Sequence, residues 1–252
     1  MSPGVHAARQ RLYADYDKHA RSPIDLDGGS FPYFNSLVRT HFPLDRAVHI
    51  LDLGCGNGTL LRAAACNGYT SVRGVDGSPA MVREAIASGA IGAEQGDINE
   101  ALRRCASASV DVIVAFDVLE HLDLDQQLEM LDDAHRVLKG GGRLILHVPN
   151  GDSPFGASVR FGDATHTTAF TTTSLAQLLF AAGFRSHESF EDQPAFGRFL
   201  REHARLRALA MGVMRGAWTL LCGGLYAWTF IETATVPTRK VYTRNLLTVA
   251  FK

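Results

Sequence analysis

The chain has 252 residues and a net charge of −1, from 25 lysines and arginines against 26 aspartates and glutamates. Hydrophobic residues make up 46%, which excludes a disordered chain, and the 4 cysteines are too few and too scattered for a disulfide scaffold. The near-zero charge gives no reason to expect nucleic acid as a partner, because proteins that bind phosphate backbones usually carry a basic excess.

The first predicted strand begins near residue 48, so residues 1–46 precede it as a lead-in that we expect to be helical. Its first 23 residues mix charged with aromatic side chains and contain no apolar core region, and we expect no signal peptide. Together with the scattered cysteines, this favours a cytoplasmic protein whose thiols are reduced.

Short apolar runs alternate with amphipathic stretches between residues 47 and 150. The runs predict five strands, at 48–53, 71–76, 91–97, 110–116 and 143–149. The amphipathic stretches predict three helices, at 59–68, 78–89 and 124–140. In the third helix we expect one buried face, formed by Leu124, Leu128, Leu131 and Val137 or Leu138, and an end at Gly140. Strands that are apolar on both faces indicate a parallel sheet covered by helices on each side.

The second half of the chain predicts a further helix at 174–184, which Thr171 caps, and two further strands at 184–192 and 244–252. The predicted fold is therefore α/β, a Rossmann-like, doubly wound, mostly parallel sheet of seven strands with helices on both faces. A helical insertion at about 193–238 precedes the last strand, within a single domain that spans 47–252.

The insertion begins with a basic stretch and continues with an uncharged run, 217–231, which is shorter than the roughly 20 residues that a membrane span needs. Three interpretations remain open. Its helices could pack on the sheet or in a homodimer, its arginines could bind the phosphates of an acceptor, or it could lie on an anionic membrane surface.

The segment LDLGCGNG (51–58) lies at the end of a predicted strand and opens a helix. Its glycines permit a left-handed backbone and a close approach to a ligand. Three acids, Asp52, Asp76 and Asp97, follow or end successive strands. They suit a ligand with ribose hydroxyls, an amine and a cationic centre, and suit a pyrophosphate poorly. An NAD site, in which Asp76 alone would have a role, is the alternative.

At these motifs the chain resembles the class I S-adenosylmethionine-dependent methyltransferases. The resemblance rests on HILDLGCGNG (49–58), GVDGSPAMV (74–82), QGDI (95–98), FDVLEHL (116–122) and RVLKGGGRLILHVPN (136–150). It implies S-adenosyl-L-methionine as cofactor and a methyltransferase domain over 47–252.

The same resemblance assigns roles to residues of the cofactor site. Gly54 and Gly56 would line the methionine moiety, with Asp52 near its amine, and Asp76 would hold the ribose hydroxyls. Asp97 and Ile98 would contact the adenine. Phe116 and Asp117 would border the transferred methyl group. Cys55 and Gly77 lie within the same motifs and complete the predicted cofactor-binding set.

The acceptor must lie beyond the carboxyl ends of the strands, where a base is needed if a hydroxyl is methylated. His166 lies in a polar loop that no core periodicity explains, and it is the predicted general base. Asp163 would orient it, bind a hydroxyl or only shape the turn, and His121 is a catalytic or a packing residue. We expect no resident metal, with a Glu120/His121 site as a minor alternative.

A narrower resemblance concerns RFGDATHTTAFT (160–171) and NLLTVAFK (245–252), which are similar to methyltransferases of bacterial surface-polysaccharide pathways. It implies O-methylation of a glycan precursor on a nucleotide or lipid carrier. Such carriers fit two of the interpretations of the insertion, phosphate binding and peripheral contact with the inner membrane. The rival acceptor is a phenol or quinone precursor, because FDVLEHL also occurs in ubiquinone-pathway O-methyltransferases. A non-catalytic binding module is the remaining alternative.

Overall fold

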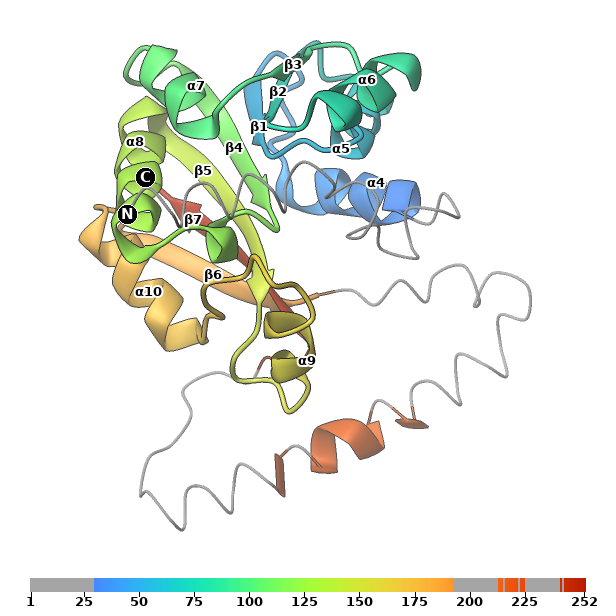
Figure 1. Cartoon of the computed structure of the whole chain (residues 1–252), viewed down its shortest axis with the longest axis vertical. Helices are drawn as coiled ribbons and strands as arrows, with labels where there is room; N and C mark the ends of the chain where they lie inside the picture. The colour runs from blue at the N-terminus through green and yellow to red at the C-terminus, as the bar shows by residue number, and fades with distance from the viewer. Residues whose placement is uncertain (1–29, 193–212, 215, 222, 225–240, 242) are drawn as a thin grey trace.

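The computed structural model describes residues 30–192, 213–214, 216–221, 223–224, 241 and 243–252. These residues build a sheet of seven strands in the order β3-β2-β1-β4-β5-β7-β6 (Figure 1). Strands β1 to β5 pair in parallel, and β7 runs antiparallel to both of its neighbours. The predicted fold class is confirmed. The strands are β1 His49–Leu53, β2 Ser71–Asp76, β3 Ala93–Gln95, β4 Val110–Phe116, β5 Leu138–Pro149, β6 Ser186–Glu191 and β7 Asn245–Phe251.

Helices cover both faces of the sheet (Figure 1). One face packs against α8 Leu124–Val137 and α10 Thr172–Ala181, through a core cluster that includes Leu131 and Leu179. The other packs against α4 Ser30–His41 and α5 Thr59–Cys66, through Val38 and Ala63. The remaining helices are α6 Pro79–Ala87, α7 Ile98–Arg104, η1 Leu119–His121 and α9 Gly156–Arg160.

Side-chain caps mark where α6, α7, α8 and α10 begin. The Ser78 hydroxyl accepts a hydrogen bond from the Met81 amide. Thr171 caps α10, as the sequence predicts, and forms a capping box with Ser174. Helix α7 was not expected. Asp97 begins it by accepting hydrogen bonds from the amides of Asn99 and Glu100.

The predicted buried face of α8 is confirmed at Leu131 and Val137 and wrong at Leu124. Leu124 is 61% exposed, whereas Gln127 is buried because its amide donates to the carbonyls of Leu119 and Leu122. The helix also ends earlier than expected, at Val137, because Leu138 already pairs with Val110 in the sheet. The buried face contains Gln127, Met130, Leu131, Ala134 and Val137.

The predicted insertion, 193–238, lies almost wholly outside the described residues, as do positions 1–29 of the lead-in. Helix α4 is the described part of that lead-in. Among the described residues, no helix has the length and apolar character that a membrane crossing requires.

Candidate cofactor and acceptor sites

The turn after β1 depends on glycine. Gly54, Gly56 and Gly58 have φ angles of 75°, 51° and 73°, a left-handed region that other residues rarely adopt. A Cβ on Gly54 would also lie 2.5 Å from the Val118 side chain, whereas one on Gly56 would meet nothing within 4 Å. The backbone at Gly56 is therefore open to a ligand.

Asp76 at the end of β2 holds this turn. One of its carboxylate oxygens accepts a hydrogen bond from the Gly56 amide at 2.8 Å, and the other accepts one from the Ser78 amide at 2.8 Å. Burial raises the pKa of Asp76, although these two hydrogen bonds oppose that shift. The carboxylate thus links two segments of the predicted site, and nothing would meet a Cβ on Gly77 between them.

Asp52 in β1 is 3% exposed. Burial, and after it the charge of Asp76, raise the pKa of Asp52 to about 8. Two carboxylates close together in a buried position favour a positively charged group, because a cation relieves their repulsion. This agrees with the chemistry predicted for the cofactor.

The other predicted cofactor residues differ in how they are placed. The Cys55 side chain is buried in a small core cluster with Leu61 and Ala85, and burial raises the pKa of its thiol. Asp97 is exposed, and its Oδ1 caps α7 at the position where Ile98 begins that helix. The Cys55 side chain therefore packs beneath the turn in the core and does not face a ligand. Asp97 uses only Oδ1 in the cap, so its Oδ2 is not used by the helix.

A buried histidine of β5, His147, lies between two carboxylates, Asp117 directly after β4 and Asp192 after β6. His147 Nδ1 pairs with Asp117 Oδ1 at 2.5 Å, and His147 Nε2 lies 3.6 Å from Asp192 Oδ2. Asp192 Oδ1 accepts the Tyr33 hydroxyl at 2.7 Å, and the Phe116 ring stacks on His147 with centroids 4.0 Å apart.

This arrangement charges His147. Burial lowers its pKa, but the charge and hydrogen bond of Asp117, together with the nearby charge of Asp192, outweigh burial and raise the pKa of His147 to about 10. Burial likewise raises the pKa of Asp117, and His147 more than reverses this. Asp117 is also a non-glycine residue with a positive φ of 55°. The imidazolium thus holds an ionised Asp117 at a strained turn.

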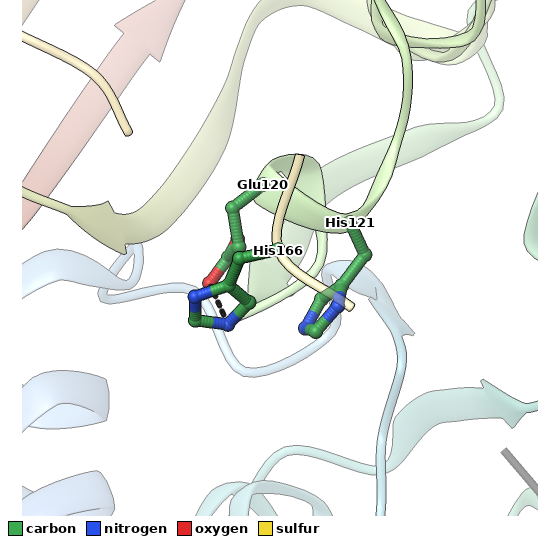
Figure 2. Close-up of side chains that lie close together, drawn as sticks. All are labelled: Glu120, His121 and His166. Atoms are coloured by element: carbon green, nitrogen blue, oxygen red, sulfur yellow. Dashed lines mark ion pairs between the residues drawn. The ribbon is translucent and has the colours of Figure 1, made fainter. Parts of the chain in front are cut away.

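Figure 2 shows three side chains that meet beside this turn, Glu120 and His121 from η1 and His166 from the loop before α10. One ligand atom from each lies within 4.8 Å of the others. His166 Nε2 is 3.9 Å from Glu120 Oε1, and the rings of His121 and His166 meet edge to face.

Neighbouring groups hold these two histidines. His121 Nδ1 bonds to the Thr165 hydroxyl at 2.8 Å, which donates to Asp163 Oδ1 at 2.6 Å. His166 Nδ1 bonds to the Val159 carbonyl at 3.1 Å. The Asp163 carboxylate therefore supports His121 through Thr165. Asp163 meets His166 through the backbone, where the His166 amide donates to the Asp163 carbonyl at 3.3 Å, and no described hydrogen bond joins the Asp163 side chain to the His166 ring.

Glu120 is 1% exposed, and in the described part of the chain its Oε2 has no hydrogen-bond partner. Burial, followed by the charge of Asp117, raises the pKa of Glu120 well above its ordinary value. A buried carboxyl with an orphaned oxygen is costly and marks a functional position.

The sequence predicts Glu120 only as part of a minor metal site, and the place of His147 within a buried strand favours a structural role for that residue. The sequence pattern does not single out Tyr33, Asp192 or Thr165. The adjacency of Glu120 to His121 was the one available signal, because the Tyr33–Asp192 contact joins residues 159 positions apart.

Comparison with known proteins decides the family. Residues 16–189, more than half of the chain, match the family described as a methyltransferase domain. The chain belongs to the methyltransferase-domain family. This confirms the predicted enzyme class and, as a property of that class, its dependence on S-adenosylmethionine.

Curated relatives of this methyltransferase share about a third of the aligned residues. A probable S-adenosylmethionine-dependent methyltransferase of Mycobacterium tuberculosis is 32% identical over 168 residues, 64% of this chain and 57% of that protein. A ubiquinone biosynthesis O-methyltransferase of Xylella fastidiosa is 32% identical over 136 residues, 52% of this chain and 50% of that protein. The chain thus spans only about half of their length.

A solved structure supports the fold. A methyltransferase from Archaeoglobus fulgidus superposes with a TM-score of 0.66 at 19% identity, covering 94% of this chain and 97% of that one. At this low sequence identity, the likeness supports the fold and nothing further.

Proposed function

We propose that this protein transfers a methyl group from S-adenosyl-L-methionine to an acceptor hydroxyl. The observation that carries the proposal is the juxtaposition of two features at the carboxyl end of β4. The resemblance assigns Asp117 to the border of the cofactor crevice, and Glu120 and His121 follow it within four residues. His166, from the loop before α10, completes their cluster.

The residues at the crevice fit the cofactor. Asp76 is held by two backbone amides, Asp52 lies buried beside it, and the backbone at Gly56 and Gly77 is open. These features suit the ribose hydroxyls, the amine and the sulfonium charge that the resemblance assigns to them. When bound, S-adenosylmethionine supplies an electrophilic methyl group.

The chain's own task is then to orient the acceptor and accept its proton. Phe116 and Asp117, locked by His147, border the position of the methyl group. His166 is the proposed proton acceptor, because its Nε2 faces Glu120 while its Nδ1 bonds to a carbonyl. The hydroxyl oxygen forms the new bond to the methyl carbon as the carbon–sulfur bond breaks.

The proposed acceptor is a sugar hydroxyl of a bacterial glycan precursor on a nucleotide or lipid carrier. The support is the resemblance of the 160–171 segment, which places Asp163, Thr165 and His166 in one polar loop. On this proposal the protein is cytoplasmic, with peripheral contact at the membrane that carries its substrate.

A phenolic or quinone precursor is the second candidate, and the Xylella fastidiosa relative favours it. Exposed Phe155, which stacks on Trp218 with centroids 5.1 Å apart, offers an aromatic surface in the same loop region.

The deciding experiment compares cells with and without the gene by mass analysis of both surface glycans and quinones. Loss of one methyl from a sugar, restored by the wild type but not by His166→Ala, would support the glycan acceptor. An unchanged glycan beside an undermethylated quinone or phenol would replace it with the second candidate. No change in any methylated product would contradict methyl transfer to either class.

A further inference from the structure

The cluster formed by Glu120, His121 and His166 has the composition of a metal site. It brings two imidazole nitrogens and one carboxylate oxygen within 4.8 Å of one another in a buried position (Figure 2). Ligands of a tetrahedral zinc ion lie roughly 3.3–3.4 Å apart. The 3.9 Å between His166 Nε2 and Glu120 Oε1 is therefore about half an ångström too long, a shift that side-chain rotation can supply.

The hydrogen bonds around the cluster set both histidines for this role. The Thr165 amide and hydroxyl both donate to Asp163 Oδ1, at 2.7 Å and 2.6 Å, so the single proton of the hydroxyl is used. The Thr165 hydroxyl must then donate to Asp163 and accept from His121 Nδ1. His121 and His166 thus both use Nδ1 as a donor, and a neutral ring that donates from Nδ1 carries its lone pair on Nε2.

The loop itself is tied to η1. The Thr167 amide and hydroxyl both donate to the Glu120 carbonyl, at 2.7 Å and 2.9 Å, and the hydroxyl also reaches the Leu122 carbonyl at 2.6 Å. These bonds fix His166 relative to Glu120 without a ligand. Glu120 Oε2 is the fully buried side-chain atom of the cluster that has no hydrogen-bond partner in the described part of the chain.

We propose that Glu120, His121 and His166 bind a divalent transition-metal cation that holds the acceptor hydroxyl. Two imidazoles with one carboxylate favour zinc, manganese or iron over magnesium and calcium, which prefer oxygen ligands. Three protein ligands leave positions open for substrate.

The role of this site rests on the proposed methyl transfer. The cation lowers the pKa of the acceptor hydroxyl, whose proton passes to solvent water. The oxygen then forms its bond to the methyl carbon, and the electron pair of the broken carbon–sulfur bond stays on sulfur. His166 becomes a ligand in this scheme instead of the proton acceptor.

The test is titration of the chelator-treated full chain with manganese, zinc and cobalt, followed by calorimetry and by the visible absorption of cobalt. We expect one cation per chain, and a loss of at least 100-fold in affinity for Glu120→Gln and for His166→Gln. Thr165→Val, which removes the support of His121, should weaken binding by about 10–100-fold. His49→Asn, on an exposed histidine at the start of β1, should bind as the wild type does.

Thermal unfolding and S-adenosylmethionine affinity of each variant separate this inference from the proposed function. Full methyl transfer after metal removal, with no cation bound, would overturn the metal site and leave His166 as the base. Cation affinity that is equal in wild type and Glu120→Gln would also overturn it. A bound cation with no methyl transfer to any hydroxyl would contradict the proposed function and keep the site.

Discussion

The predicted cofactor crevice and the proposed acceptor cluster lie at the same end of the sheet but are built in different ways. The crevice is built from a backbone turn, at Gly56, and from acids at the ends of strands, such as Asp76 in β2. The acceptor side brings together residues that are far apart, with His166 beside Glu120 and Tyr33 linked to Asp192. Local runs of sequence therefore determine the first region, and tertiary packing determines the second.

The largest expected effect is on turnover, and it should distinguish the acceptor side from the cofactor crevice. His166→Ala is expected to lower turnover by about 10²–10⁴-fold, because it removes either a proton acceptor or a metal ligand. The affinity for S-adenosylmethionine should stay within a factor of two. Calorimetry and a single-turnover assay with the wild-type acceptor measure the two quantities, and near-normal turnover would exclude His166 from the chemistry.

The opposite pattern is expected for Asp76→Ala. Two amide hydrogen bonds and the predicted ribose contact disappear together, and each bond to a charged group contributes about 1.5–3 kcal/mol. We expect S-adenosylmethionine to bind about 100-fold more weakly, with turnover at saturation changed far less. Asp76→Asn is the matched control, since it keeps one acceptor oxygen. Unchanged affinity in Asp76→Ala would move the ribose site elsewhere.

Much of the cofactor region could be predicted from sequence. Apolar runs placed the strands, and the glycines of 54–58 predicted the turn, because each feature is local. The sequence pattern does not reveal helix α7, because the helix is only seven residues long and its cap, Asp97, is also a predicted cofactor ligand.

The acceptor side was predicted less well, for physical reasons. Hydrophobic periodicity cannot identify a buried polar residue, so Gln127 was missed and Leu124 was placed inside. The Thr165 link between His121 and Asp163 depends on how the loop folds back on η1. Such pairings have no signature in residue spacing.

Asp52 predicts a pH dependence of cofactor binding. Its folded-state pKa of about 8 lies above its ordinary value of about 3.9, so the group is protonated in the free protein at neutral pH. A cationic ligand favours the ionised form, so binding releases a proton and affinity rises with pH, by at most about tenfold per unit, until about pH 8. Calorimetry in buffers of different ionisation enthalpy measures the proton release.

Asp52→Asn supplies the control, because the cofactor's own amine titrates equally with both proteins. The difference between the two proteins in how cofactor affinity changes with pH is therefore due to Asp52. The same raised pKa makes Asp52 destabilise the free fold as pH rises from about 4 to about 8, since the folded state then binds more protons than the unfolded state. Identical pH profiles for variant and wild type would contradict both expectations.

The smallest effects test whether backbone geometry alone builds the crevice. Gly56→Ala should destabilise the fold by about 1–2 kcal/mol, because φ of 51° is unfavourable for alanine even though space is open. Gly77→Ala meets equally open space without a left-handed φ and should be neutral or stabilise by about 0.4–1 kcal/mol, through the lower entropy of the unfolded chain. Urea denaturation without cofactor measures both. If both variants lose the same free energy of unfolding, the loss does not come from the left-handed turn at Gly56 but from surroundings that the two glycines share.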